Sequence, residues 1–214
     1  MTNLISHAFK DDEKKLVTFV TGGDPDFATS LQIIKTIINN GADIMEIGMP
    51  FSDPMADGPT IQLSSNRAIS KGIDLENIFS LAFEAKKTKS DLPVILMGYY
   101  NLILYFGIER FVKKCKENGV DGLIIVDLQP EEDEDLIYEL KKSVAFIKKH
   151  TNLPVVPGFG IKNSTDVNNI CKIADGAVVG SSLIKIIEEN LNNKDKMLSE
   201  IDKFSKDLKW GTKI

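Results

Sequence analysis

The fold is decided by a stretch that reads Glu46-Ile47-Gly48-Met49-Pro50-Phe51-Ser52-Asp53-Pro54-Met55-Ala56-Asp57-Gly58-Pro59-Thr60-Ile61-Gln62. It grows out of a mostly apolar run, residues 42–47, that contains Glu46 near its end. The loop after the run, residues 49–60, holds three prolines, one glycine and two more acids. A carboxylate inside an apolar run is costly to bury without a partner or a task. An acid at a strand end, followed by a stiff acidic loop, is how parallel α/β enzymes present catalytic groups.

Short apolar segments alternate with helical segments along the whole chain. Helical spacing of apolar residues separates the strand-like segments, with Ser164 as the expected N-cap of one helix. Near-continuous apolar strands in such an alternation predict a parallel sheet covered on both faces. The predicted fold class is α/β, of the (β/α)8 TIM-barrel type, forming a single domain over residues 1–214 with about six β/α units visible. The six expected strands are residues 16–21, 42–47, 92–99, 122–127, 153–156 and 176–179.

Composition excludes several classes of protein. A net charge of −5 and a pI near 5.2 argue against general nucleic-acid binding. Cys115 and Cys171 form no CxxC pair, and His7 and His150 are the only histidines, so no zinc, disulfide or multi-histidine metal site is indicated. The first residues lack the apolar core of a signal peptide, and no apolar run approaches the ~18 residues of a membrane span. The expectation is a soluble, cytoplasmic protein.

Two glycine loops predict a phosphate site. Gly158-Phe159-Gly160 follows one expected strand, and Gly180-Ser181-Ser182 follows the next and opens a helix. Glycine lets the backbone approach an anion closely, and a helix N-terminus supplies unpaired N–H groups and partial positive charge. Either loop alone reads as a plain turn, but the loops after the last two strands of a barrel are neighbours and form its usual phosphate site.

Glu46 is the first candidate for catalysis. Strand alternation places Met45 and Ile47 on one face, which would pack on helices, and Glu46 on the other face with Ile44 and Gly48. An acid on the inner face is rarely tolerated for structure alone, although pairing with a lysine on the helix face is the ordinary alternative.

The loop acids and several other polar residues are weaker candidates. Ser-Asp-Pro at Asp53 and Ala-Asp-Gly at Asp57 are good turn sequences, so either acid could serve the loop alone. Asp127 also ends an expected strand, whereas His150 precedes one and would lie at the non-catalytic end of a barrel. The residues after the third strand could line a pocket or pack in the core; these are Tyr99, Tyr100 and Asn101.

Five motifs in this order carry a family resemblance. The block MEIGMPFSDPMADGPTIQ at residues 45–62 closely resembles the signature of the tryptophan synthase α subunit. Residues 19–25 (FVTGGDP), 97–101 (MGYYN), 158–161 (GFGI) and 179–181 (VGS) resemble the family in the same way. The resemblance covers nearly the whole chain, and the long block is far more specific than the glycine motifs.

The resemblance implies a lyase that cleaves indole-3-glycerol phosphate to indole and glyceraldehyde 3-phosphate, a retro-aldol reaction of tryptophan biosynthesis. It assigns Glu46 as the acid and base, and Asp57 as the carboxylate that holds the indole N–H and stays ionised in its polar loop. It implies no cofactor in this chain, a pyridoxal-phosphate β subunit as partner in an α2β2 complex, and a place for residues 50–59 at that interface. The implied ligand-binding residues are Gly160, Gly180 and Ser181 for phosphate, with Phe159, Phe19 and Tyr99 around indole and phosphate.

One departure from the family concerns the middle of the chain. Two central β/α units, one carrying the loop that closes over the substrate, are missing between Asp127 and Leu153, with a join near residues 140–143. Either the sequence omits residues or the protein is shortened. Omission is the favoured explanation, because six strands of an eight-strand plan would leave open edges and exposed apolar surface. An intact mass of 23.7 kDa for the native protein would show that the deletion is real.

Two alternative functions stay open. A chain without the closing loop could be a catalytically weak module that binds and activates the β subunit, since closure excludes water and completes such a site. Another phosphate-binding barrel, an aldolase or isomerase, is the third reading, but a Schiff-base aldolase needs a lysine inside a strand and none of the expected strands contains one.

Overall fold

A computed structural model describes residues 4–55, 57–127, 154–158 and 161–213. Its centre is a five-stranded sheet in the order β4-β3-β2-β1-β5, in which every pairing is parallel. The prediction of a parallel sheet is therefore confirmed. The strands are β1 (Lys15–Thr21), β2 (Ile44–Gly48), β3 (Val94–Gly98), β4 (Gly122–Ile125) and β5 (Gly176–Val179).

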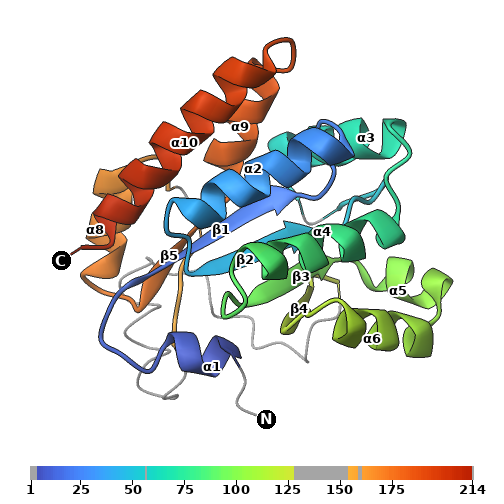
Figure 1. Ribbon diagram of the computed structural model, residues 1–214, viewed down its shortest axis with the longest axis horizontal. Coiled ribbons are helices and arrows are strands. Elements are labelled where there is room, and N and C mark those ends of the chain that lie inside the picture. The colour runs from blue at the N-terminus through green and yellow to red at the C-terminus, as the bar shows by residue number, and fades with distance from the viewer. Residues whose placement is uncertain (1–3, 56, 128–153, 159–160, 214) are drawn as a thin grey trace.

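Helices follow most strands and cover the sheet (Figure 1). Three pairs of helices pack against each other in a row: α8 with α10, α10 with α2, and α2 with α4. The helices are α1 (Leu4–Ala8), α2 (Phe27–Asn39), α3 (Pro59–Ser70), α4 (Leu75–Thr88), α5 (Tyr100–Phe106), α6 (Ile108–Glu117), α8 (Ser164–Cys171), α9 (Ser181–Glu189) and α10 (Lys194–Gly211). None of these described helices has the length and apolar character needed to cross a lipid bilayer.

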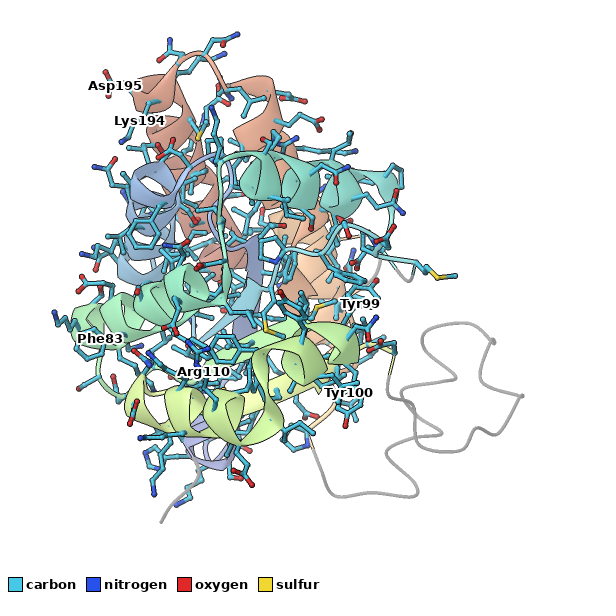
Figure 2. All side chains as sticks on the ribbon, turned by 90° about the vertical axis from the view of Figure 1, so that its right-hand side faces the viewer. Phe83, Tyr99, Tyr100, Arg110, Lys194 and Asp195 are labelled. Carbon is cyan, nitrogen blue, oxygen red and sulfur yellow. The ribbon has the colours of Figure 1, made fainter. Side chains whose placement is uncertain are left out.

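The core lies between the sheet and its helices. Met45 and Ile47 of β2 are fully buried there, together with Ile34 and Ile37 of α2 and other residues of α4. The polar surfaces of the helices face outward, although Phe83 of α4 points into solvent beneath the ammonium of Lys87 (Figure 2). The prediction that Met45 and Ile47 pack on helices is confirmed, which leaves the opposite face of β2 for Glu46.

The expected strand at residues 153–156 is not present in its described part. Residues 154–158 are not a strand, yet the carbonyls of Val155 and Pro157 accept the N–H groups of Asp175 and Val178 at 3.0 and 2.9 Å. The segment thus lies along β5 without forming a regular ladder. Pro154 and Pro157 explain the difference, because proline has no N–H to donate.

Helix ends differ from expectation in three places. The seven-residue helix α5 was not expected, and Gly107, with φ at +93°, separates it from α6. The N-cap of α8 is Asn163 rather than Ser164, since the Asn163 side chain accepts the N–H of Asp166 at 2.9 Å. The continuous helical pattern expected at the C-terminus is two helices in the structure, because α9 stops before Asn190 and Asn193 caps a new helix.

β1 also begins one residue earlier than expected, at Lys15. The Lys15 side chain is buried at the N-terminal end of this strand, where it forms an ion pair with Asp11 at 2.5 Å. A lysine there is at the amino end of the sheet, so it does not supply the interior lysine that a Schiff-base aldolase needs.

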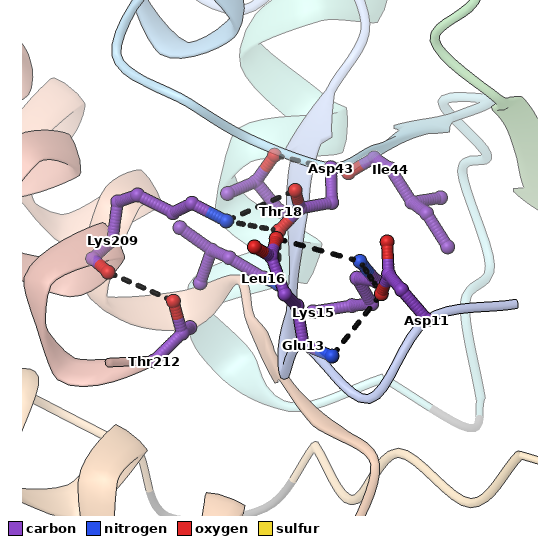
Figure 3. Close-up of polar contacts among 9 residues, drawn as sticks. All are labelled: Asp11, Glu13, Lys15, Leu16, Thr18, Asp43, Ile44, Lys209 and Thr212. Atoms are coloured by element: carbon purple, nitrogen blue, oxygen red, sulfur yellow. Dashed lines mark hydrogen bonds and ion pairs between the residues drawn. The ribbon is translucent and has the colours of Figure 1, made fainter. Parts of the chain in front are cut away.

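Aspartates tie neighbouring strands together at the amino end of the sheet. In each case the aspartate precedes one strand, and its carboxylate accepts an N–H from the neighbouring segment. Asp43 also pairs with Lys209 of α10 at 2.7 Å, so that one carboxylate joins β1, β2 and the last helix (Figure 3). The three contacts are Asp43 with Leu16 at 2.7 Å, Asp121 with Val94 at 2.8 Å, and Asp175 with Val155 at 2.8 Å.

Replacing Asp43 with alanine is expected to destabilise the fold by ~1–3 kcal/mol, because the buried N–H of Leu16 would lose its acceptor. Urea unfolding should show a lower midpoint with an unchanged dependence on denaturant. Asp207→Ala, at an exposed position of α10, is the control and should change stability by less than ~0.5 kcal/mol. Equal midpoints for the two variants would show that the contacts of Asp43 with Leu16 and Lys209 contribute nothing to stability.

Candidate active site

The carboxyl ends of the parallel strands meet at one end of the sheet and gather the candidate residues there. Thr21 ends β1, Gly48 ends β2, Tyr99 follows β3 and Gly180 follows β5. Tyr99 and Tyr100, side by side at the start of α5, mark this end of the molecule in Figure 2. A parallel sheet thus brings together residues that are far apart in sequence, as α/β enzymes do at their active sites.

Glu46 lies on the inner face of β2, between two apolar neighbours. The strand register pairs it with Phe19 of β1 and with Ile95 of β3, and paired residues in a parallel sheet point to the same side. Glu46 is 5% exposed, and no described residue makes a hydrogen bond or ion pair with its carboxyl group. Burial alone raises the pKa of Glu46 from 4.5 to about 7. This carboxyl group can therefore both give and take a proton near neutral pH.

Asp57 lies in the loop after β2 and is held by two neighbours. The hydroxyl of Tyr99 donates to Asp57 Oδ2 at 3.1 Å, and the side-chain amide of Gln62 donates to the Asp57 carbonyl at 2.8 Å. Burial raises the pKa of Asp57 above its ordinary value, while the hydrogen bond from Tyr99 acts in the opposite direction. Asp57 is thus half-buried in its loop.

A cavity joins Asp57 to the strand ends. Asp57 and Tyr99 form one side, and Phe51 packs against the Tyr99 ring with 5.0 Å between centroids. The sequence interpretation missed several lining residues, although Ile61 and Ser65 are four apart on α3 and so share a helix face that could have been predicted. The cavity is lined by Phe19, Thr21, Gly48, Met49, Asp57, Ile61, Ser65, Met97, Gly98 and Tyr99.

Phe19 connects the carboxylate region to the loop before α9. A Cβ on Gly48 would lie 2.7 Å from Phe19 Cζ, and a Cβ on Gly180 would lie 3.0 Å from Phe19 Cδ1. A side chain at Gly48 would therefore displace the ring, and one at Gly180 would press closely against it. Since Phe19 is also the register partner of Glu46, the Gly180 loop and Glu46 flank the same aromatic side chain.

The first N–H groups of α9 have no acceptor in the described part of the chain. The Gly180 carbonyl accepts the N–H groups of Leu183 and Ile184, whereas no described residue accepts the N–H of Ser181 or Ser182. The Ser182 hydroxyl donates to the carbonyl of Ile161 at 2.9 Å, which ties this helix start to the segment after the other glycine loop. Phe159 and Gly160, the other predicted phosphate and indole residues, lie outside the described residues.

Glu46, Gly180 and Ser181 are not among the residues that line this cavity, and the remaining candidates do not line it either. Asp53 is exposed and accepts the Ser52 hydroxyl, and Asp127 accepts the N–H of Tyr100 at 2.8 Å. Asn101 is exposed at the start of α5, and His150 lies outside the described residues. Over the described ranges, no group of three or more His, Cys, Asp or Glu side chains is placed to hold a metal ion.

Comparison with known proteins gives one consistent result. The sequence model of the family described as "Tryptophan synthase alpha chain" matches residues 5–143 and 134–213. The chain is similar to the tryptophan synthase alpha chain of Geotalea uraniireducens, with 39% identity covering 95% of this chain and 94% of the relative. The relative of the same name from Petrotoga mobilis is 36% identical, covering 96% of this chain and 98% of its own length.

Solved structures agree. Tryptophan synthase subunit alpha of Legionella pneumophila superposes with a TM-score of 0.92 at 28% identity, covering 99% of each chain. A chain of tryptophan synthase from M. tuberculosis, at 21% identity and a TM-score of 0.87, covers 99% of this chain and 100% of its own length and shares the fold. With these neighbours, the parallel sheet and its helices are of the (β/α)8 barrel type.

The comparisons also locate the departure from the family. The two matched pieces overlap at residues 134–143, a range that includes the predicted join near residues 140–143. The match to the first relative extends over 254 residues although this chain has 214, so the relative carries residues that this sequence lacks. Matches of this identity and coverage leave a single conclusion. The chain belongs to the tryptophan synthase alpha chain family, the lyases of tryptophan biosynthesis that cleave indole-3-glycerol phosphate.

Proposed function

We propose that Glu46 is the acid and base with which this chain cleaves indole-3-glycerol phosphate. The observation that carries the assignment is a buried carboxyl group in β2, two residues before the strand ends, without a described polar partner and with a pKa of about 7. Structural acids are normally paired when buried, whereas a general acid or base works best with a pKa near the operating pH.

The reaction needs one proton given and one taken. The protonated Glu46 donates a proton to C3 of the indole ring, which breaks the aromaticity of the five-membered ring and leaves a positive charge on its nitrogen. The Glu46 carboxylate then accepts the proton of the glycerol hydroxyl next to the ring. As the C–C bond breaks, its electron pair returns to the ring, releasing indole and glyceraldehyde 3-phosphate, and Glu46 is protonated again as at the start. No cofactor in this chain takes part in these steps.

Asp57 is proposed to hold the indole N–H and to balance the positive charge that forms on the ring nitrogen. Its carboxylate faces the cavity, where Tyr99 and Gln62 fix its place. The proposed role needs the ionised carboxylate, and the hydrogen bond from Tyr99 favours that form. The aromatic rings of Phe19 and Tyr99 line the same small cavity, and the proposal places the indole ring against them.

The phosphate is proposed to bind at Gly180 and Ser181, where α9 begins, with Gly160 and Phe159 completing the site. The N–H groups of Ser181 and Ser182, which have no acceptor among the described residues, and the dipole of α9 favour an anion there. Phe19 lies between this helix start and β2, so a substrate whose phosphate binds at Gly180 would reach Glu46 with its glycerol carbons.

A β subunit that carries pyridoxal phosphate is the proposed partner, in an α2β2 complex, with the loop of residues 50–59 at the interface. This loop and the neighbouring α5 expose large apolar side chains: Met55 is 94% exposed and Tyr105 is 96% exposed. A hollow of about 510 Å³ lies beside them, lined among others by Pro50, Phe51 and Leu102. Exposed apolar surface around such a hollow is typical of a protein interface.

The experiment that tests the proposal measures indole release from indole-3-glycerol phosphate by the full chain, alone and with the β subunit. Release of indole in step with glyceraldehyde 3-phosphate is expected in both cases, with a higher rate in the complex. Stimulation of the β subunit without any indole production would instead support the interaction module. Binding of neither substrate nor β subunit would overturn both.

Replacing Tyr99 with phenylalanine is expected to lower kcat/KM about fivefold, because one hydrogen bond to Asp57 is worth ~1 kcal/mol. Loss of the bond should also raise the pKa of Asp57 further, so activity should fall more at low pH than at high pH. A pH series of kcat/KM checks both effects. Tyr105→Phe, at an exposed site on α5, is the control for the isolated chain, and equal values for both variants would contradict the role of Tyr99.

A further inference from the structure

A cluster of three charged side chains, built around the buried Asp24, lies beside the site but outside the proposed chemistry. The Arg67 guanidinium donates from Nε and Nη2 to the two oxygens of Asp24, each at 2.8 Å. The Asp24 side chain has no exposed surface, and Arg67 Nη1 lies 3.6 Å from Glu188 Oε1. We call Asp24, Arg67 and Glu188 the ion triad. Its members come from the loop after β1, from α3 and from the last turn of α9.

The loop that carries Asp24 is attached to the carboxyl end of the sheet. Asp24 lies three residues after Thr21, whose hydroxyl hydrogen-bonds to the hydroxyl of Ser64 on α3. Ser64 and Arg67 are three residues apart on the same helix face, so α3 is attached to the loop after β1 at two successive points. The N–H of Gly22, between these points, donates to the carbonyl of Gly48 at the end of β2.

Helix α3, which carries Arg67, also contacts the loop of Asp57, where the indole ring is proposed to bind. Gln62, in the first turn of α3, donates to the carbonyls of Asp57 at 2.8 Å and Pro54 at 3.4 Å. The position of α3 therefore fixes the position of the loop that carries Asp57. Ile61 and Ser65 of the same helix line the cavity.

Helix α9, which carries Glu188, begins at the residues where the phosphate is proposed to bind. Glu188 is near the end of α9, and the same helix begins at Gly180 and Ser181. α3 and α9 pack against each other, and Arg67 crosses between them. A rigid helix transmits a shift at Glu188 to its first turn, so this contact helps to set where the phosphate donors lie.

We propose that the ion triad is a positioning device that sets the separation between the ring-binding end at Asp57 and the phosphate-binding end at Gly180. The inference rests on the proposed function of those two ends. A bidentate arginine holds a fixed geometry better than lysine would, whereas a buried ion pair adds little net stability. The geometry, rather than stability, is thus what the triad contributes.

The test compares ligands that engage one end with a ligand that engages both. Indole engages the ring end alone, glyceraldehyde 3-phosphate engages the phosphate end alone, and indole-3-glycerol phosphate spans the two. The full chain and its Arg67→Lys and Glu188→Gln variants are assayed for kcat/KM with the whole substrate and for competitive inhibition by each product. Glu188→Gln removes only the half-exposed arm and keeps the buried Asp24–Arg67 pair, so this variant should fold even if Arg67→Lys does not.

A fall in kcat/KM of about tenfold is expected for Arg67→Lys and of about threefold for Glu188→Gln, since a misplacement of 1 Å can cost ~100-fold. Both inhibition constants should stay within twofold of wild type. Glu84→Gln, which breaks the Lys35–Glu84 pair between α2 and α4, is the control and should change nothing.

Two results would overturn the inference. Unchanged kcat/KM in both variants would show that the triad does not set the geometry, and inhibition constants that weaken together with kcat/KM would show a general structural role. Failure of the proposed function is a separate result, because the wild-type chain itself would then bind neither product at the expected end. That outcome removes the two ends and the inference with them.

Discussion

Glu46→Gln is expected to lower kcat for indole release by about 10³-fold, within the ~10²–10⁴ range of general acid–base catalysis. Glutamine keeps the size of the side chain but cannot give and take a proton near neutral pH. KM should change little, because the inner-face position of Glu46 lies between Phe19 and Ile95 and is not assigned to either binding end. Steady-state kinetics with purified chain, alone and with the β subunit, measures both constants.

The matched control for this variant is Glu84→Gln, the same chemical change on the outer surface of α4, where full activity is expected. Circular dichroism and urea unfolding should show both variants folded. Turnover at the wild-type rate in folded Glu46→Gln would remove Glu46 from the catalytic assignment, whatever the family likeness.

The second large effect is a pH dependence of stability that Glu46 creates. Its pKa is about 7 in the folded chain and 4.5 as its ordinary value, so between these pH values the folded state binds more protons than the unfolded state. The free energy of unfolding therefore decreases as the pH rises from about 4.5 to 7, by about 3 kcal/mol from this group. Well above pH 7 the carboxylate is ionised in both states and its contribution is constant.

Glu46→Gln removes this titration, so the variant should gain about 3 kcal/mol relative to wild type between pH 4.5 and pH 8. Urea unfolding of both proteins across this range gives the difference, in which the titrations of all other groups cancel. A difference that stays flat with pH would show that Glu46 is not desolvated in the folded protein. A gain in stability together with lost activity would be the expected signature of a buried catalytic acid.

Local patterns in the sequence were enough to predict most strands of the sheet and to predict which residues of β2 face the helices. Alternation along β2 separates Met45 and Ile47 from Glu46, and the structure keeps them on opposite faces. The glycine loop at Gly180 also begins a helix as predicted. Where expectation was wrong, the local rule had a competitor: Pro154 and Pro157 interrupt the ladder of the segment expected at residues 153–156.

By itself, the sequence determined the parallel α/β class and the family. Both follow from local properties: strands and helices from periods of two and 3.6 residues, and the family from the signature block. Only the tertiary structure decided the environments of the acids. Tyr99 reaches Asp57 over 42 residues and Arg67 reaches Asp24 over 43. The raised pKa of Glu46 likewise comes from its burial in a strand that has β1 on one side and β3 on the other. Desolvation and hydrogen bonding depend on what surrounds a carboxyl group in space, and that is known only once distant segments have packed together.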